Sequence, residues 1–144
     1  SLKAEIPKQL KHKVYIAKVD EKGNFWHMGN IWRNNMLSAK VREFGNFCVI
    51  ADTINPIVKG VNIYPGKKFN TQTSIKCTIE DKESGIDNFR AEIDGKWILM
   101  EYDYKRKLLT FDIPKDFNRG KHTFNLTVSD KLKNKKIYTA EFFR

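Results

Sequence analysis

The stretch IDGKWILMEYDYKRKLL, residues 93–109, decides how this sequence folds. Asp94-Gly95 is typical of a two-residue β-hairpin turn, because a type I′ turn needs positive φ at both central residues. The run NFRAEI enters this turn, KWILMEY leaves it, and DYKRK predicts a second turn before LLTFDI. The stretch is therefore predicted to be a β-meander. Glu92, Glu101 and Asp103 alternate with apolar residues, which favours a solvated sheet face over a pair of catalytic carboxylates.

The same period of two recurs along the chain, and no long helical pattern accompanies it. In TSIKCTIE, residues 73–80, the alternate residues Ile75, Cys77 and Ile79 form one apolar face. HTFNLTVSD, residues 122–130, and KIYTAEFF, residues 136–143, have the same β-rich character. Strands at this spacing, with hairpin turns between them, predict an all-β protein built as an antiparallel immunoglobulin-like β-sandwich.

A domain boundary is predicted near ADTINPIVKG, because Pro56 cannot donate to a strand ladder and suits the start of a strand. Residues 53–144 hold about seven predicted strands, enough for one immunoglobulin-like sandwich. Residues 1–52 form a smaller β-rich segment, whose predicted strands are HKVYIAKV, NFWHMGNIW, MLSAKVREF and NFCVIAD. Four strands are too few for an independent core. The segment is therefore either the end of an upstream sandwich or a small sheet packed on the second domain, and we expect the two parts to form one rigid unit.

Three longer stretches carry a family resemblance: VREFGNFCVIADTINPIV, ESGIDNFRAEIDGKWILMEYDYKRKLLTF and GKHTFNLTVSDKLKN. Together they resemble the C-terminal region of bacterial cell-envelope proteins in which a lysostaphin-like zinc peptidase domain precedes β-sandwich modules. The resemblance runs from about residue 12 to residue 144. It implies an exported protein of the periplasm or cell envelope, and the opening SLKAEIPK is compatible with removal of a leader. Lys133 stands where similar immunoglobulin-like domains have glycine, so the last turn is expected to differ.

The resemblance does not extend to the zinc-binding elements of the peptidases. Peptidases of that type carry an H-x-x-x-D element and an H-x-H element, and a catalytic zinc needs about three protein ligands. The histidines here are His12, His27 and His122, and the residues four positions after them are Ile16, Ile31 and Leu126. The sequence therefore predicts no enzyme, no catalytic residue, no metal and no cofactor. It predicts a non-catalytic accessory module that positions a neighbouring domain of the same polypeptide or binds cell-wall material.

Charge and aromatic residues suggest alternative ligands. Lys and Arg outnumber Asp and Glu by 27 to 17, which favours anionic partners. A nucleic-acid binder would interleave aromatic and basic residues along one face, and YDYKRK does so only briefly, so nucleic acid is not expected. No apolar run is long enough to span a membrane. A carbohydrate-binding module that holds cell-wall glycan or peptidoglycan is the main alternative, with Trp97 predicted in the core and the binding residues predicted as Trp26, Trp32, Tyr102 and Tyr104.

Two further features stay open. Calcium could be held at the domain boundary by acidic side chains, because the ion takes six to eight oxygen ligands. The candidates are Asp52, Asp81, Glu83 and Asp130, but few scattered acids in a basic chain favour solvated turns over such a site. Cys77 is expected in the core because it alternates with isoleucines, and a bridge to Cys48 is neither required nor ruled out.

Overall fold

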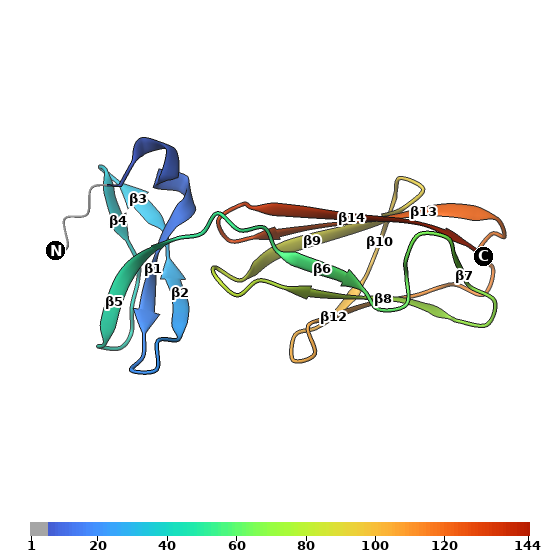
Figure 1. Cartoon of the computed structure of the whole chain (residues 1–144), viewed down its shortest axis with the longest axis horizontal. Coiled ribbons are helices and arrows are strands. Elements are labelled where there is room, and N and C mark those ends of the chain that lie inside the picture. Colours follow the sequence, from blue (N-terminus) through green and yellow to red (C-terminus); the bar gives the residue numbers. More distant parts are fainter. Residues whose placement is uncertain (1–5) are drawn as a thin grey trace.

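The computed structural model describes residues 6–144, and the opening residues 1–5 of SLKAEIPK lie outside it. The protein consists of two β-rich parts placed end to end (Figure 1). The first part begins with a short 3-10 helix, η1 (Lys8–Lys13). Its five strands are β1 (Val14–Val19), β2 (Phe25–Gly29), β3 (Ile31–Arg33), β4 (Met36–Ser38) and β5 (Asn46–Ala51). They form one three-stranded sheet in the order β2-β1-β5 and one β3-β4 hairpin.

The second part is an antiparallel sandwich of two sheets. Its strands are β6 (Ile57–Gly60), β7 (Lys67–Lys68), β8 (Ser74–Glu80), β9 (Ile86–Ile93), β10 (Lys96–Ile98), β11 (Glu101–Asp103), β12 (Leu108–Asp112), β13 (Lys121–Asp130) and β14 (Lys135–Phe143). One sheet has the order β10-β9-β13-β14-β7 and the other the order β11-β12-β8-β6. Only the short β7 pairs in parallel with its neighbour, at the edge of the first sheet. The predicted all-β, immunoglobulin-like fold is therefore confirmed.

The core lies between these two sheets, where the alternating residues of the sequence place it. In β8 the residues Ile75, Cys77 and Ile79 are fully buried, and in β13 the residues Phe124 and Leu126 are as well. Burial of apolar surface at roughly 25 cal/mol per Å² makes this shared core the main source of stability. The first part has no comparable core, because its buried apolar residues among those described are Val14, Tyr15 and Ala17.

The Asp94-Gly95 turn is confirmed, because Asp94 has φ 51° and Gly95 has φ 74°. The prediction that Trp97 packs in the core is wrong, since 57% of this side chain is exposed. Trp97 pairs with Glu92, whereas its neighbour Ile98 pairs with the buried Ala91. Alternation along the edge strand β10 therefore places the indole on the outer face of the sheet.

Two predicted strands are shorter than the sequence suggested. KWILMEY was expected to be one strand, but the chain passes from one sheet to the other within it, so β10 and β11 belong to different sheets. At this crossing Met100 enters the core and Leu99 faces outward. MLSAKVREF was also expected to be a strand, and only β4 at its start is one. The second part has nine strands instead of the predicted seven because KWILMEY divides into two and because β7 was not predicted. The described residues of the first part hold five strands instead of four because NFWHMGNIW divides into β2 and β3.

The two cysteines are free. Cys77 is fully buried in the sandwich core, as expected, and burial raises the pKa of its thiol to about 12. Cys48 lies half-buried on β5 in the first part. A thiol with so high a pKa is a poor nucleophile at neutral pH, so Cys77 acts as a small apolar residue.

Replacing Gly95 with valine should lower the free energy of unfolding by about 1–3 kcal/mol, the range for a residue held in an unfavourable backbone region. A Cβ at Gly95 would meet no atom within 4 Å, so the expected loss comes from the positive φ alone. Urea denaturation measures the loss. The matched control is Gly95→Asn, because asparagine tolerates the left-handed region. Equal stability of the valine variant and the native protein would contradict the type I′ assignment.

Candidate functional site

The first candidate site is the junction between the two parts. Tyr15, Ala17, Cys48 and Ile50 lie on one face of the three-stranded sheet and pack against Leu132, in the β13–β14 turn. Tyr15 is 1% exposed, and its ring stacks on His27 with 4.9 Å between ring centroids. Burial, with a smaller contribution from the charge of Asp52, raises the pKa of Tyr15 to about 12. The tyrosine is therefore a neutral hydrogen-bond donor over the physiological range.

Hydrogen bonds cross the junction beside this apolar contact. The Tyr15 hydroxyl donates to the Glu83 carbonyl oxygen at 3.0 Å. Lys13 Nζ donates to the Leu132 carbonyl oxygen at 3.0 Å and to Asn134 Oδ1 at 2.5 Å. Asn134 Nδ2 in turn donates to the Asp52 carbonyl oxygen at 3.1 Å. Four such bonds between buried or part-buried groups restrict the orientation of the two parts, because each partner left unpaired would cost free energy.

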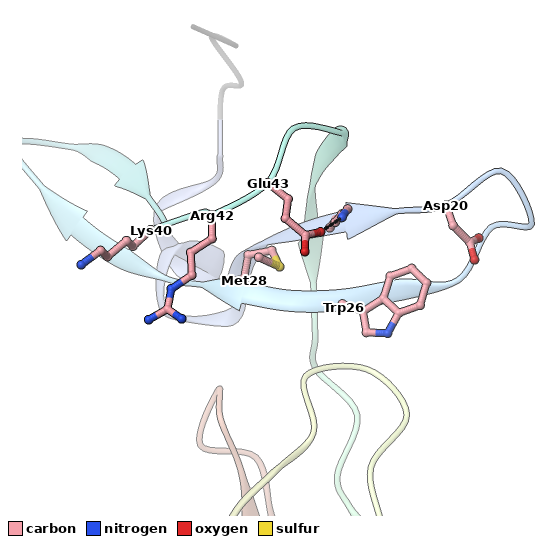
Figure 2. Close-up of a pocket in the computed structure, with 7 residues that line it drawn as sticks. Asp20, Trp26, Met28, Lys40, Arg42 and Glu43 are labelled. Carbon is pink, nitrogen blue, oxygen red and sulfur yellow. Dashed lines mark hydrogen bonds and ion pairs between the residues drawn. The ribbon is translucent and has the colours of Figure 1, made fainter.

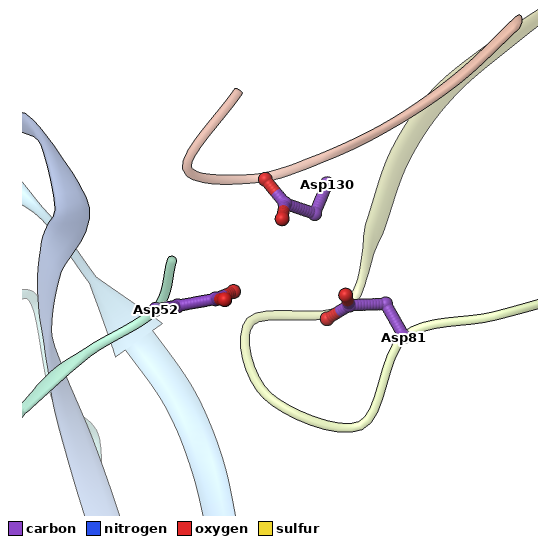
Figure 3. A group of neighbouring side chains, drawn as sticks. All are labelled: Asp52, Asp81 and Asp130. Carbon is purple, nitrogen blue, oxygen red and sulfur yellow. The ribbon is translucent and has the colours of Figure 1, made fainter. Parts of the chain in front are cut away.

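Three aspartates meet at the centre of the junction (Figure 3). Asp52 ends the first part, Asp81 follows β8, and Asp130 ends β13. One carboxylate oxygen from each lies within 4.8 Å of the corresponding oxygens of the other two. Asp52 and Asp130 are 0% exposed. The structure thus brings together three of the four acidic residues suggested by the sequence for a cation, while Glu83 contributes its backbone carbonyl to the bond with Tyr15.

Backbone N–H groups donate to all three carboxylates, and for Asp81 the donor is Gly85 at 2.7 Å. Asp130 Oδ1 accepts the N–H groups of Leu132 and Asn134, each at 2.8 Å, and its Oδ2 accepts Asn134 Nδ2 at 2.7 Å. Asp52 Oδ1 accepts the Ile54 N–H at 3.0 Å, and its Oδ2 accepts the Ser84 N–H at 3.2 Å. The turns at residues 52–54, 81–85 and 130–134 therefore present their carboxylates in fixed positions.

The second candidate site is a pocket of about 570 Å³ on the first part (Figure 2). Trp26 and Met28 line it from β2, and Lys18 lines it from β1. The other lining residues are Asp20, Lys40, Arg42 and Glu43. Side chains alternate along β2, so the pocket lies on the opposite face of the sheet from His27 and the junction. Sequence reasoning missed Lys40, Arg42 and Glu43 because it assigned them to a strand, whereas they lie in the loop between β4 and β5.

The pocket combines an exposed ring with several charges. The Trp26 side chain is 49% exposed. Glu43 accepts a bond from Lys18 Nζ at 2.5 Å, which lowers the pKa of its carboxyl. Lys40 and Arg42 form no ion pair with any residue in the range 6–144. The pocket therefore offers a flat apolar ring next to cationic hydrogen-bond donors, which suits a sugar or another polar ring with anionic groups.

The structure does not bring the four predicted binding aromatics together. Trp26 lines the pocket, whereas Trp32 is half-buried on β3 with Lys11 Nζ 5.5 Å from its ring centroid. Tyr102 and Tyr104 lie in the second part, with ring centroids 6.2 Å apart. Tyr102 packs against the sandwich core, and Tyr104 is 81% exposed. The two tyrosines form one small aromatic pair, and Trp26 belongs to a different surface.

The three histidines also lie apart and show no shared metal geometry. His27 is in the junction, where burial lowers its pKa. His122 Nδ1 lies 2.7 Å from Asp94 Oδ2 and its Nε2 lies 3.0 Å from the Asn118 carbonyl oxygen, which ties two turns of the sandwich together. His12 is on η1. Within residues 6–144, the three aspartates of the junction are the only cluster of metal-donor side chains.

One family model matches part of the chain. Residues 1–52 match the family described as the Zu5-like domain, and residues 53–144 lie outside that match. A search of curated proteins found no match. Among residues 6–144, no helix is long and apolar enough to cross a membrane.

Three solved structures are distantly similar. CopC from Methylosinus trichosporium OB3b is 14% identical, with TM-score 0.45 over 60% of this chain and 92% of that one. The endo-beta-1,4-mannanase from Thermotoga petrophila is 11% identical, with TM-score 0.49 over 65% of this chain and 21% of that one. The fibronectin(III)-like modules of CbhA from Clostridium thermocellum are 16% identical, with TM-score 0.46 over 69% of this chain and 55% of that one. Structural similarity with TM-scores below 0.5 does not indicate the activity of this protein.

Proposed function

We propose that this chain is a non-catalytic accessory module of an exported bacterial cell-envelope protein, in which it holds a neighbouring domain of the same polypeptide in a fixed position. The observation that carries the proposal is the junction, where apolar contact and buried hydrogen bonds join a small sheet to a complete sandwich. A rigid joint between two parts is what a positioning module needs, because a flexible linker would let the parts reorient freely. The envelope location rests on the resemblance of SGI, IDGKW and EYD to the envelope proteins named above.

Rotational diffusion tests this proposal. If the junction is rigid, the amides of β1 and β5 should report the same rotational correlation time by ¹⁵N relaxation as the amides of β13 and β14. Two separate correlation times in the native chain would contradict a positioning role. A purified, zinc-loaded sample should also leave peptidoglycan peptides intact, and cleavage would overturn the non-catalytic assignment.

The pocket beside Trp26 favours a second candidate function, binding of cell-wall carbohydrate. An exposed indole can stack on the apolar face of a sugar ring, and Arg42 and Lys40 can donate hydrogen bonds to hydroxyl or anionic groups. Stacking does not depend on ionic strength, whereas binding to nucleic acid falls steeply with salt. A salt titration therefore separates these two ligand classes.

Replacing Trp26 with alanine should abolish retention on isolated cell-wall polysaccharide while changing the free energy of unfolding by about 1 kcal/mol or less, as for an exposed side chain. Co-sedimentation with cell-wall material measures retention, and urea denaturation measures stability. The matched control is Trp97→Ala, since Trp97 is similarly exposed and lies in the other part. Equal retention of both variants would exclude Trp26 as the binding residue.

A further inference from the structure

The junction brings three carboxylates together, and none of them is in an ion pair with a described residue. Asp52 and Asp130 are fully buried, and neither they nor Asp81 form an ion pair with any lysine, arginine or histidine in the part of the chain that the structure describes. Lys13, at the edge of the junction, donates its hydrogen bonds to the Leu132 carbonyl oxygen and to Asn134 Oδ1. Like charges this close in a buried site repel strongly unless a cation or a proton intervenes.

Two buried oxygen atoms at the same place lack a partner. Asp81 Oδ1 accepts the Gly85 N–H at 2.7 Å, whereas Asp81 Oδ2 is buried and has no hydrogen-bond partner among the described residues. Ser84 is 1% exposed, its N–H donates to Asp52, and its Oγ is likewise buried without a partner. Buried polar atoms are nearly always satisfied in native proteins, so each of these oxygens is expected to have a partner, either a water molecule or a bound ion.

Burial raises the pKa of Asp81 above its ordinary value, and the charges of Asp52 and Asp130 add to the rise while the Gly85 hydrogen bond opposes it. Burial is the larger cause, and the two neighbouring carboxylates act in the same direction. A bound cation would oppose both effects at Asp81.

We propose that Asp52, Asp81 and Asp130 bind a calcium ion that joins the two parts of the protein. Oxygen ligands of calcium lie about 2.3–2.6 Å from the ion, so two ligands of one ion are separated by at most about 4.6–5.2 Å. The three carboxylate oxygens meet this condition, because they lie within 4.8 Å of one another. The donor set contains only oxygen, which suits a hard cation rather than zinc or copper. Calcium is favoured over magnesium because it accepts irregular geometry and gives up its waters readily.

The three proposed ligands come from both parts of the protein, so a bound ion would cross-link the two parts. Asp52 belongs to the end of the first part, and Asp81 and Asp130 belong to two turns of the sandwich. An ion held by all three cross-links segments that are 29 or more residues apart in the sequence, as the residue numbers show. Calcium binding should therefore stabilise the folded junction by mass action, since the unfolded chain does not hold the three carboxylates together. The site rests on the junction geometry alone and does not depend on the proposed function.

Calcium chloride is the probe for the native chain after treatment with a chelator. Isothermal titration should show one calcium site per chain, and the melting temperature should rise with calcium concentration. The ring of Tyr15 lies beside the site, so terbium bound there should show tyrosine-sensitised luminescence that calcium displaces. Magnesium at equal concentration should compete at least about tenfold more weakly.

Asp81→Asn is the decisive variant, because it keeps an oxygen for the Gly85 N–H and removes the charge. It should weaken calcium binding at least about tenfold while folding normally without calcium, since it relieves repulsion. Asp112→Asn is the matched control, because it makes the same change at an exposed position of β12. Asp52→Asn serves as a second variant if Asp81→Asn does not fold. The proposal is overturned if millimolar calcium leaves the native melting temperature unchanged, or if the Asp81 and Asp112 variants bind calcium equally.

Discussion

Replacing Asp130 with alanine is expected to lower the free energy of unfolding by about 3–5 kcal/mol, measured in a calcium chelator. The carboxylate is fully buried and accepts three hydrogen bonds, two from backbone N–H groups and one from Asn134 Nδ2. A buried donor left without a partner costs about 1–3 kcal/mol. The cost of leaving three such donors unpaired exceeds the gain from removing the repulsion with Asp52 and Asp81. The variant should therefore be less stable than the native protein.

Urea denaturation followed by circular dichroism measures this loss. Asp130→Asn is the matched control, because its amide oxygen can still accept the two backbone bonds while its NH₂ group faces another donor. It should lose about 1–2 kcal/mol, since only one hydrogen bond is broken. Equal losses in the alanine and asparagine variants would show that the charge, rather than the hydrogen bonds, stabilises the turn at residues 130–134.

Replacing Tyr15 with alanine is expected to cost about 3–5 kcal/mol of stability in the first part, the usual range for deletion of a buried aromatic side chain. Among the described residues of the first part, Tyr15 is the largest buried side chain, and its ring and hydroxyl both contact other groups of the junction. Since the first part buries few other apolar residues, its three-stranded sheet should open before the sandwich unfolds.

Amide hydrogen exchange distinguishes local opening from global unfolding. Protection of β1 and β5 should fall about a hundredfold or more, because each 1.4 kcal/mol is a factor of ten, while β13 and β14 keep their native protection. Tyr15→Phe is the control, since it removes only the bond to the Glu83 carbonyl and should cost about 0.5–1.5 kcal/mol. Uniform loss of protection in both parts would mean that the protein unfolds as a single cooperative unit.

Much of the sandwich could be predicted from the sequence, because its central strands bury one face and expose the other. β8 and β13 alternate without interruption, and their period of two is sufficient to assign them. The passage from β10 to β11 could not be predicted. The apolar residues of KWILMEY are compatible both with one continuous strand and with a chain that crosses from one sheet to the other. Trp97 was misplaced for a related reason. A tryptophan in a strand of an immunoglobulin-like domain is usually buried, whereas the register of β10 against β9 places this ring on the outer face.

The candidate sites were only partly accessible to sequence reasoning. Asp52, Asp81 and Asp130 each stand at a strand end, which suggested solvated turns more readily than a cation site. Only the topology shows that these strand ends meet at one end of the sandwich. The positions of the aspartates in the sequence do not show that Asp52 and Asp130 are buried. Burial matters because a buried carboxylate needs compensating partners, whereas an exposed one is solvated by water. Of the predicted aromatics, only Trp26 lines the pocket on the first part, because Tyr102 and Tyr104 belong to the other part.

The position of the junction divides the sandwich into a constrained end and an unconstrained end. The turns at residues 81–85 and 130–134 contact the first part, whereas β7 and the C-terminus lie at the opposite end (Figure 1). Insertions and sequence changes between β12 and β13 therefore leave the joint untouched, because exposed loops tolerate added length at little entropic cost. Such a module can acquire new loops at one end during evolution, or in protein engineering, while the attachment at the other end stays the same.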